Sequence, residues 1–444
     1  MNNIFGTDGV RGCANEGYIT PENVMKLAVS AVNYYCTNKT YKSVNSKFTV
    51  VIGKDTRLSG YMLEPALTAG FIAAGAAVVL LGPIPTPGVA FMTRSLRADL
   101  GVMISASHNP YQDNGIKFFN HKGFKISAFD ELKISEIFFN GQKLTSTESI
   151  GKAKRLDDAT GRYVEFVKSS FPKDLNLSGL KIVIDTANGA AYKIAPQIFW
   201  ELGAEIVKVG DYPNGININQ HCGATAPESL QQAVLENSAN IGIALDGDAD
   251  RVVIVDETGK VIDGDYLIAA IATGWHNSGK LRENSVVATV MSNLGLEKYL
   301  DSIGLKLVRS DVGDKYVIEK MLEIGTNIGG EKSGHIIPID YSSTGDGCIA
   351  ALQILAYLIR TNQNVSSIGK LYKSYPQLLK NTEKIIDIED PQTSAFILRI
   401  KNIIGSNGRI LIRKSGTEPV SRIMIEAEDL KTLNAAEAEL QAFL

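Results

Sequence analysis

Short hydrophobic runs rich in valine and isoleucine alternate with longer amphipathic stretches along most of the 444-residue chain. Uninterrupted apolar runs are typical of strands buried on both faces, and the amphipathic stretches predict helices between them. Strands are expected at residues 48–52, 77–81, 99–104, 181–185, 205–209, 241–245, 285–289 and 306–309, and helices at 63–74, 194–202 and 294–303. This alternation predicts α/β domains with mostly parallel sheets.

The last part of the chain has a different order of elements. Residues 409–413 and 422–428 are expected to form two strands joined by a short loop, and a helical stretch follows them. Such an order is typical of a smaller α+β domain. Since domains of this size class hold about 150 residues, we expect several domains and place their limits at 1–150, 151–255, 256–370 and 371–444.

Composition narrows the class of protein. The chain carries 45 Lys and Arg against 48 Asp and Glu, a net charge of -3, and has no long basic run. Nucleic-acid-binding and membrane-surface proteins usually carry a basic patch, so neither is expected. The four cysteines form no CxxC pair, residues 1–12 carry no secretory signal, and the apolar stretch 69–82 is too short to cross a bilayer. We therefore expect a cytoplasmic protein with reduced thiols.

A polar loop, SASHNP at residues 105–110, follows the hydrophobic run 99–104. Open α/β sheets bind ligands at the carboxyl ends of their strands, so this loop is a candidate site. Ser107 and His108 are neighbours, and neighbours in an extended chain point to opposite sides. We therefore do not expect His108 to activate Ser107, and Lys117 in the downstream run DNGIKFF is a better placed partner. A polar turn without chemistry is the alternative.

Three carboxylates alternate in the loop DGDADR, which directly follows the run 241–245. Asp246, Asp248 and Asp250 would repel one another without a cation, and Mg²⁺ accepts such oxygen ligands together with phosphate oxygens. A calcium EF-hand loop fits the acidic spacing, but it requires glycine where Arg251 stands. The loop therefore predicts a magnesium site, with a solvated acidic turn as the alternative.

The run GGEKSGH at residues 329–335 combines glycines with side chains suited to a sugar. Glycines allow the backbone to come close to a ligand. Glu331 and Ser333 could form hydrogen bonds with sugar hydroxyls, and His335 titrates near neutrality. An ordinary glycine-flanked turn is the alternative on these residues alone.

Two further loops carry arginines. The run RKSGTEP at residues 413–419, followed by Arg422, combines forked arginine donors with hydroxyls, which is typical of a phosphate site. The run FGTDGVRG at residues 5–12 is a glycine-rich loop that carries Arg11. A plain hairpin turn and an ordinary N-terminal loop are the respective alternatives.

Taken in order, FGTDGVRG, SASHNP with DNGIKFF, DGDADR, GEKSGH and RKSGTEP resemble the motifs of the α-D-phosphohexomutase family over essentially the whole chain. The resemblance implies three α/β domains of mixed or parallel sheet and a C-terminal α+β domain like the TATA-box-binding protein, around a central cleft. It implies an isomerase that moves phosphate on a hexose through a phosphoserine and a hexose 1,6-bisphosphate, with one Mg²⁺ per subunit. The first two motifs are most similar to bacterial members that convert glucosamine 6-phosphate to glucosamine 1-phosphate for UDP-N-acetylglucosamine and cell-wall synthesis.

The resemblance also implies a role for each matching residue. Ser107 would carry the phosphate, and Asp246, Asp248 and Asp250 would bind Mg²⁺ together with that phosphate. Lys117 and His335 would be the candidate bases, and Arg11 would stabilise the phosphoryl group in transit. Substrate binding would fall to His108, Arg251, Glu331, Ser333, Arg413, Ser415, Gly416, Thr417 and Arg422.

The chain departs from the family's usual pattern at two of these loops. Ala249 stands where glycine is usual, and because it supplies no ligand atom we expect its methyl group to be tolerated. Lys332 stands where the members acting on glucosamine usually have glutamine, in a loop that helps to choose the sugar. Glucose and mannose phosphates are therefore alternative substrates, and a phosphatase or a non-catalytic sugar phosphate binding protein are alternative functions. A homodimer has precedent in the family, and a kinase or self-phosphorylation would load Ser107.

Overall fold

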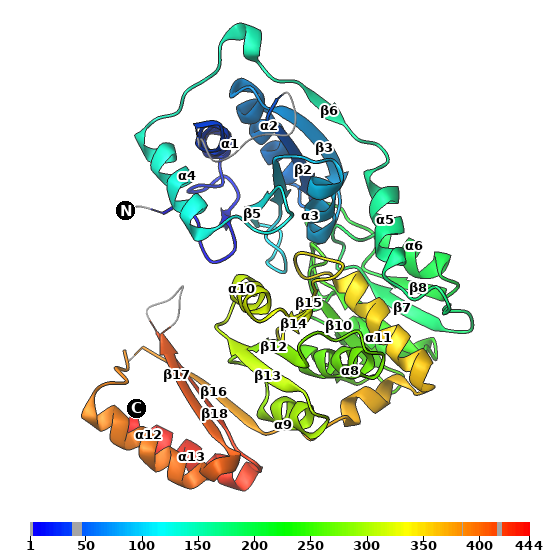
Figure 1. The fold of residues 1–444 in the computed structure, drawn as a ribbon, viewed down its shortest axis with the longest axis vertical. Helices are drawn as coiled ribbons and strands as arrows, with labels where there is room; N and C mark the ends of the chain where they lie inside the picture. The colour runs from blue at the N-terminus through cyan, green and yellow to red at the C-terminus, as the bar shows by residue number, and fades with distance from the viewer. Residues whose placement is uncertain (1–2, 38–46, 384, 415–419) are drawn as a thin grey trace.

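The computed structural model describes residues 3–37, 47–383, 385–414 and 420–444, and these form four sheets in chain order (Figure 1). Within these ranges no helix is long and apolar enough to cross a membrane. The predicted strands all occur, and the predicted helices are α2 (Gly60–Ala73), α6 (Ile194–Glu201) and α9 (Leu294–Ser302). The predicted α/β class with a different C-terminal part is therefore confirmed.

The first sheet has six strands in the order β1-β5-β4-β2-β3-β6. Its central strands are parallel, whereas β1 and β5 run antiparallel at one edge. The sheet is mixed because the run DNGIKFF folds back on β4 as a strand. The strands are β1 (Val10–Cys13), β2 (Thr49–Lys54), β3 (Ala77–Pro83), β4 (Leu100–Ile104), β5 (Asp113–Asn120) and β6 (Ala153–Arg155).

Helices cover both faces of this sheet because its central strands carry apolar residues at successive positions. Val50 and Ile52 on β2 pack in one core cluster with α1 (Pro21–Thr37), α2 and α4 (Ala128–Asn140). Val51 lies between them and packs in a second cluster with α3 (Thr86–Ser95). The period-2 alternation of a strand thus distributes one hydrophobic run between two cores.

The second and third sheets repeat the same plan of parallel strands with antiparallel strands at one edge. The second has the order β11-β10-β9-β7-β8 and the third the order β13-β12-β14-β15. The second comprises β7 (Lys181–Asp185), β8 (Glu205–Val209), β9 (Ile241–Leu245), β10 (Val252–Asp256), β11 (Val261–Ile262), α5 (Ala159–Ser169), α6 and α7 (Glu228–Glu236). The third comprises β12 (Ser285–Thr289), β13 (Lys306–Ser310), β14 (Ile328–Gly330), β15 (Ile336–Pro338), α8 (Gly264–Asn277), α9, α10 (Asp314–Ile324) and α11 (Gly347–Thr361).

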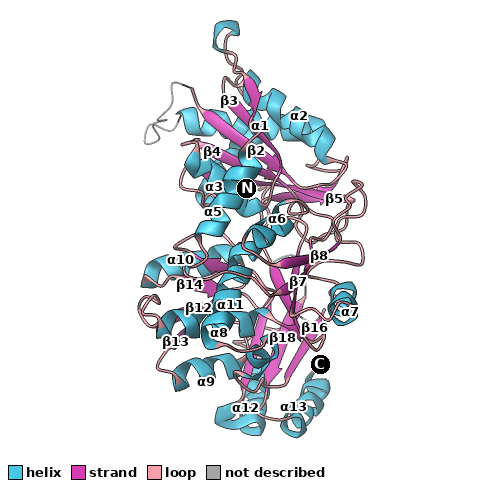
Figure 2. Cartoon of the chain, turned by 90° about the vertical axis from the view of Figure 1, so that its right-hand side faces the viewer, coloured by secondary structure: helices cyan, strands magenta, loops and turns pink. Residues whose placement is uncertain are grey.

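The fourth sheet is antiparallel and has three strands in the order β16-β18-β17. Its strands are β16 (Gln377–Thr382), β17 (Arg409–Lys414) and β18 (Ser421–Glu426). Figure 2 shows α12 (Pro391–Ile404) and α13 (Leu430–Phe443) together on one side of this sheet. The sheet therefore keeps one face free of its own helices.

Every sheet carries one polar loop between a strand and its antiparallel neighbour. These loops connect β4 to β5, β9 to β10, β14 to β15 and β17 to β18. In the first three sheets the loop leaves the carboxyl end of a strand of the parallel set, where ligands bind in open α/β sheets. The first three sheets thus supply equivalent positions for site residues, whereas residues 415–419 of the loop after β17 lie outside the described residues.

The first three sheets share one hydrophobic core cluster, whereas the fourth sheet has its own. One cluster contains residues from the first three sheets, including Val51, Ile243 and Val286. The fourth sheet has its own cluster, which includes Phe396, Ile425 and Leu440. Because no described core cluster joins the fourth sheet to the rest, motion of this part about its connection is expected.

Candidate active site

The serine loop, residues 105–112, connects β4 to β5 and places Ser107 in a buried, strained position. Ser107 is 2% exposed and has a φ of 53°, in the left-handed region that few residues other than glycine adopt. Its backbone N–H donates to Ser105 Oγ over 2.9 Å, and Ser105 Oγ donates to Asp55 Oδ2 over 2.7 Å. The surrounding contacts therefore hold Ser107 in a conformation that it would not choose alone.

Arg57 holds the serine loop through its backbone carbonyls. Its guanidinium donates to the carbonyls of Ser107 at 2.9 Å, Asn109 at 2.8 Å and Asp113 at 3.0 Å, and also to that of Pro110. Its remaining N–H, on Nε, donates to Asp55 Oδ2 at 2.8 Å. Arg57 is 1% exposed, so this buried cation uses all of its N–H groups on the serine loop, on the first residue of β5 and on Asp55.

His108 lies beside the Ser107 hydroxyl, contrary to the expectation from alternation. His108 Nδ1 is 3.3 Å from Ser107 Oγ. The expectation was wrong because it assumed an extended chain, whereas the left-handed φ of Ser107 turns the two side chains to the same side. Burial, with Arg251 and Arg11 nearby, lowers the pKa of His108 to about 4, so this imidazole is neutral at neutral pH.

The aspartate loop, residues 246–251, connects β9 to β10 and meets the serine loop directly. Ser107 Oγ donates to Asp246 Oδ2 over 2.6 Å. The two backbones are so close that a Cβ at Gly247 would lie 2.6 Å from the carbonyl oxygen of Ser107. A hydrogen bond between Ser107 and Asp246 thus joins a loop of the first sheet to a loop of the second.

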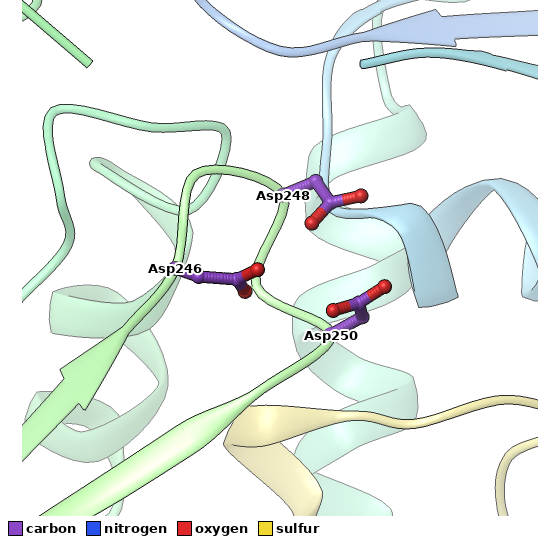
Figure 3. A group of neighbouring side chains, drawn as sticks. All are labelled: Asp246, Asp248 and Asp250. Atoms are coloured by element: carbon purple, nitrogen blue, oxygen red, sulfur yellow. The ribbon is translucent and has the colours of Figure 1, made fainter. Parts of the chain in front are cut away.

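Asp246, Asp248 and Asp250 are buried, and their carboxylates turn toward a common space (Figure 3). One oxygen of each lies within 4.8 Å of the others. The loop turns through Ala249, which has a φ of 58°. A left-handed alanine costs about 1–2 kcal/mol relative to an ordinary conformation, which explains why glycine suits this position.

The donor set of this cluster fits a divalent cation. Asp248 Oδ1 and Asp250 Oδ1 have no hydrogen-bond partner among the described residues, and an unsatisfied buried carboxylate oxygen is costly. Burial, together with Asp250 and Asp248, raises the pKa of Asp246 to about 8. A cation bound between the carboxylates would remove both penalties. The cluster is therefore consistent with a metal site.

Lys117 on β5 neutralises part of the negative charge of the three aspartates. Its ammonium nitrogen lies 2.8 Å from Asp248 Oδ2, 3.1 Å from Asp8 Oδ2 and 3.4 Å from Asp250 Oδ2. Although burial disfavours the charged form, these three carboxylates raise the pKa of Lys117 above its ordinary value. Lys117 is therefore held as a cation.

A second group of charges joins the first sheet to the third across the site. Lys125 contacts Asp8 and lies 2.6 Å from Asp314 Oδ2 at the start of α10, and Arg11 also contacts Asp8. Against the effect of burial, Asp314 and Asp8 raise the pKa of Lys125 above its ordinary value. Opposite charges thus hold the two sides of the site together.

His335 lies between two carboxylates at the end of the loop of residues 331–335, which we call the sugar loop after the role that the sequence predicts for it. Its Nδ1 is 3.6 Å from Asp250 Oδ1, and its Nε2 is 3.6 Å from Asp314 Oδ2. Against burial, Asp250, Asp314 and Glu331 raise the pKa of His335. Its Nε2 accepts the backbone N–H of Gly345 at 3.1 Å, so the neutral ring carries its proton on Nδ1, facing Asp250.

Glu331 and Ser333 lie together on the sugar loop. Ser333 Oγ donates to Glu331 Oε2 over 3.2 Å, and Glu331 Oε1 accepts the backbone N–H of Gly313 at 3.0 Å. Arg251 Nε has no hydrogen-bond partner among the described residues, although its side chain is largely buried. Its Nε lies 4.0 Å from Asp250 Oδ1, so Arg251 adds a positive charge beside the aspartate loop.

A cleft of about 320 Å³ brings the predicted residues of all four sheets together. Nine of them line it: Arg11, Ser107, His108, Asp250, Arg251, Glu331, His335, Arg413 and Arg422. Asp246, Asp248 and Lys117 lie beneath Ser107 through the contacts given above, and Ser333 contacts Glu331 at the rim. The predictions for Ser415, Gly416 and Thr417 concern positions outside the described residues.

Sequence reasoning missed five residues that shape or line the site. Arg57 and Asn219 hold the serine loop, and Asn219 Nδ2 donates to the carbonyl oxygen of Ser107 at 2.9 Å. Asp8, Lys125 and Asp314 line the cleft. Asp8 stands inside the FGTDGVRG motif and so could have been noticed, whereas the others gave no local signal.

Sequence profiles of phosphoglucomutase/phosphomannomutase match almost the whole chain. The alpha/beta/alpha domains I, II and III match residues 2–145, 161–259 and 263–375, and the C-terminal domain matches 362–442. The chain is 54% identical over 444 residues to a phosphoglucosamine mutase of Parvibaculum lavamentivorans, covering 99% of this chain and 98% of that protein. It is 53% identical over 433 residues to one of Paramagnetospirillum magneticum, covering 96% and 95%.

Solved structures share the fold. A phosphoglucomutase/phosphomannomutase family protein of Burkholderia thailandensis superposes with a TM-score of 0.83 at 23% identity, covering 99% of this chain and 96% of that one. An N-acetylphosphoglucosamine mutase of Aspergillus fumigatus in complex with GlcNAc-6P and magnesium gives a TM-score of 0.66 at 17% identity, covering 99% and 94%. At these identities the likeness concerns the fold alone.

Replacing Arg57 with Lys tests its hold on the serine loop. Lysine keeps the positive charge but lacks the several N–H donors of the guanidinium group, so buried carbonyls lose their hydrogen bonds. The free energy of unfolding should therefore fall by about 2–4 kcal/mol. Urea unfolding measures the loss. The matched control is Arg162→Lys, which changes an exposed arginine paired with Asp158 and should stay within about 0.5 kcal/mol. Equal stability of the two variants would contradict the assigned contacts.

The raised pKa of Asp246 predicts a pH-dependent response to Mg²⁺. Because its folded pKa of about 8 exceeds the ordinary value of 3.8, the metal-free protein should lose stability as pH rises between these values. A bound cation displaces the proton, so Mg²⁺ should raise the thermal midpoint more at about pH 8 than at about pH 6. Asp248→Asn should abolish the Mg²⁺ response, whereas Asp158→Asn on an exposed helix cap should keep it. A response that is independent of pH and of Asp248 would refute the site.

Proposed function

The chain belongs to the phosphoglucomutase/phosphomannomutase family, the phosphohexomutases, and we propose that it interconverts glucosamine 6-phosphate and glucosamine 1-phosphate. The observation that carries the proposal is the hydrogen bond from Ser107 Oγ to Asp246 inside the buried aspartate cluster. Full-length relatives at more than 50% identity bear the name phosphoglucosamine mutase. The product would feed UDP-N-acetylglucosamine and cell-wall synthesis. A phosphoglucomutase or phosphomannomutase with the same mechanism is the alternative.

The reaction would proceed by two phosphoryl transfers through Ser107. In the first, a sugar hydroxyl oxygen forms a bond to the phosphorus of phosphorylated Ser107 while the bond to the seryl oxygen breaks. The hydroxyl proton passes to a base, and the seryl oxygen takes up a proton. The resulting 1,6-bisphosphate turns within the cleft and returns its other phosphate to Ser107. A hexose 1,6-bisphosphate would also prime unphosphorylated enzyme.

Asp246, Asp248 and Asp250 would hold one Mg²⁺ together with an oxygen of the phosphate on Ser107. When bound, the ion would withdraw negative charge from the phosphoryl oxygens, which is the main requirement of phosphoryl transfer. The two carboxylate oxygens without hydrogen-bond partners in the described chain support this assignment.

Lys117, Arg11 and His335 would handle charge and protons around the transferred phosphoryl group. Lys117 is held as a cation by its carboxylate neighbours, which suits a donor of the proton that the seryl oxygen takes up. His335 lines the cleft and is the candidate to accept the proton of the attacking hydroxyl, which requires its Nε2 to give up the hydrogen bond from the Gly345 N–H. Arg11 lines the same cleft and would stabilise the phosphoryl group in transit.

The remaining residues would hold the substrate at its two ends. Glu331 and Ser333 would bind sugar hydroxyls, and His108 and Arg251 would contact the phosphate near Ser107. The second phosphate would lie against the loop between β17 and β18, held by Arg413, Ser415, Gly416, Thr417 and Arg422. Arg413 and Arg422 line the same cleft as His108, Arg251 and Glu331, which supports the arrangement.

The proposal includes the organisation of the chain. Residues 1–150 would form the phosphoserine domain, 151–255 the metal domain, 256–370 the sugar domain and 371–444 the phosphate-binding domain. The described cysteines are all free, which supports a cytoplasmic location. We further propose a homodimer, and loading of Ser107 by a kinase or by self-phosphorylation.

Ser107→Ala tests the phosphoserine. Without the hydroxyl no covalent intermediate forms, so mutase turnover with the bisphosphate primer present should fall by about a thousandfold or more. Ser146→Ala, in an exposed loop, is the matched control and should leave turnover unchanged. Near-normal turnover of the Ser107 variant would exclude the proposed intermediate.

Comparing three substrates tests the sugar. Glu331 brings a carboxylate to the cleft at the proposed sugar position, and it should attract the ammonium group of glucosamine. We expect kcat/KM for glucosamine 6-phosphate to exceed the values for glucose and mannose 6-phosphates by about tenfold or more. Preference for either neutral sugar would favour the alternative mutase, and phosphate release without isomerisation would indicate a phosphatase.

A further inference from the structure

The free face of the fourth sheet carries three rows of side chains in register. Residues on its strands alternate between the face covered by α12 and α13 and the free face. Paired positions place Arg409, Glu426 and Gln377 in one row, which we call the hinge row. The next row holds Leu411, Met424 and Leu379, and the last holds Arg413, Arg422 and Asn381. The last row belongs to the proposed phosphate site.

The hinge row fastens the fourth sheet to the third. Glu426 is fully buried and accepts hydrogen bonds from Arg409 Nε at 2.6 Å, Gln377 Nε2 at 2.7 Å and the backbone N–H of Leu294 at 3.1 Å. Arg409 also donates to the carbonyls of Val290 and Ser292, at 2.9 and 2.8 Å. A buried anion thus joins both sheets at the start of α9.

Lys332 extends this row to the sugar loop. Its ammonium donates to Gln377 Oε1 over 2.7 Å and lies 3.9 Å from Asp263 Oδ2. Its neighbour Glu331 lines the cleft, whereas Lys332 is absent from the described residues that do so. The charge of Lys332 is therefore directed to the fourth sheet and to Asp263, and not to the sugar position.

We infer that Lys332 is a positioning residue, which ties the sugar loop to the phosphate-binding sheet through Gln377 and Glu426 and takes no part in choosing the sugar. The inference rests on the proposed function, in which one substrate contacts both parts. Glu426 and Arg422 lie on the same strand, four residues and about 13 Å apart. The strand therefore acts as a rigid arm between the tie and the phosphate site.

The contact between Lys332 and Gln377, which we call the tie, should affect substrate binding more than turnover. Glu331 and Ser333 must contact the sugar while Arg413 and Arg422 contact its distant phosphate, so the relative position of the two groups sets binding. Loss of one partly exposed hydrogen bond should weaken substrate binding by a factor of about three to ten. Because ground state and transition state share these contacts, the loss should raise KM and leave kcat nearly unchanged.

The experiment compares Lys332→Met, Gln377→Met, the double variant and Lys332→Arg, which keeps a donor within reach. The matched control is Lys320→Met, which removes a partly exposed lysine paired with Glu323 on α10. Kinetics with glucosamine and glucose 6-phosphates give kcat, KM and the ratio of kcat/KM for the two sugars. Hydrogen exchange of residues 371–377, followed by mass spectrometry, reports on the connection itself and needs no activity.

Lys332→Met and Gln377→Met should each raise KM for both sugars by about three to ten times and speed exchange in residues 371–377. The double variant should be no worse than the poorer single one, because both remove the same tie. Lys332→Arg should restore most of the binding and the slow exchange. A changed sugar ratio with unchanged exchange, or no change in either, would overturn the inference. If wild-type protein isomerises no hexose phosphate, the proposed function fails, while exchange still decides whether the tie exists.

Discussion

Three buried carboxylates on one short loop impose the constraint on which the rest of this site depends. Asp246, Asp248 and Asp250 lie within reach of one ligand, out of water, where like charges repel strongly. Lys117 supplies one charge of opposite sign, and the Ser107 hydroxyl supplies one hydrogen bond. These contacts of the described chain neutralise only part of the negative charge, and a bound cation would neutralise the rest. A cation bound there would also attract the phosphate of a phosphorylated Ser107.

That constraint extends to the serine loop and across the cleft. Arg57 donates to the carbonyls of the serine loop and to Asp55, and it fixes the loop so that the Ser107 hydroxyl meets Asp246 with a left-handed backbone at Ser107. Lys125 crosses from the first sheet to Asp314 at the start of α10, and it shares Asp8 with Arg11. The first three sheets share a hydrophobic core, so these charges lie on one framework. The fourth sheet has a separate core and attaches through polar contacts, which suits a part that must release and hold the substrate in turn.

Features that depend on residues close together in the chain could be predicted from the sequence. The spacing of Asp246, Asp248 and Asp250 predicts a convergent cluster because alternate residues of one loop face the same space. The hydrophobic runs predict the strands because most of them, such as β4 and β9, are buried on both faces. His108 was placed wrongly since alternation holds only for extended chain, and the positive φ of Ser107 is imposed by distant partners. The antiparallel edge strands that make each sheet mixed also depend on pairing, which a single run does not encode.

The residues that the sequence could not supply act through tertiary contacts. Arg57 binds backbone carbonyls about fifty positions away, and carbonyls carry no sequence signature. Lys125 and Asp314 become partners only when two sheets meet. Lys332 was considered as a residue that affects the choice of sugar because of its neighbours in the loop, yet its ammonium donates to Gln377 on another sheet. Position in a motif indicates where a residue lies, and packing decides what its side chain contacts.

The most direct measurement follows a labelled phosphate on Ser107 through a single turnover. Protein carrying isotopically labelled phosphoserine is mixed with glucosamine 6-phosphate, quenched at short times and analysed by mass spectrometry of the Ser107 peptide and the sugars. The account predicts that label leaves Ser107, appears in glucosamine 1,6-bisphosphate and then in glucosamine monophosphate, while unlabelled phosphate returns to the serine. Label that stays on Ser107 during turnover, or that is released as inorganic phosphate, would contradict it.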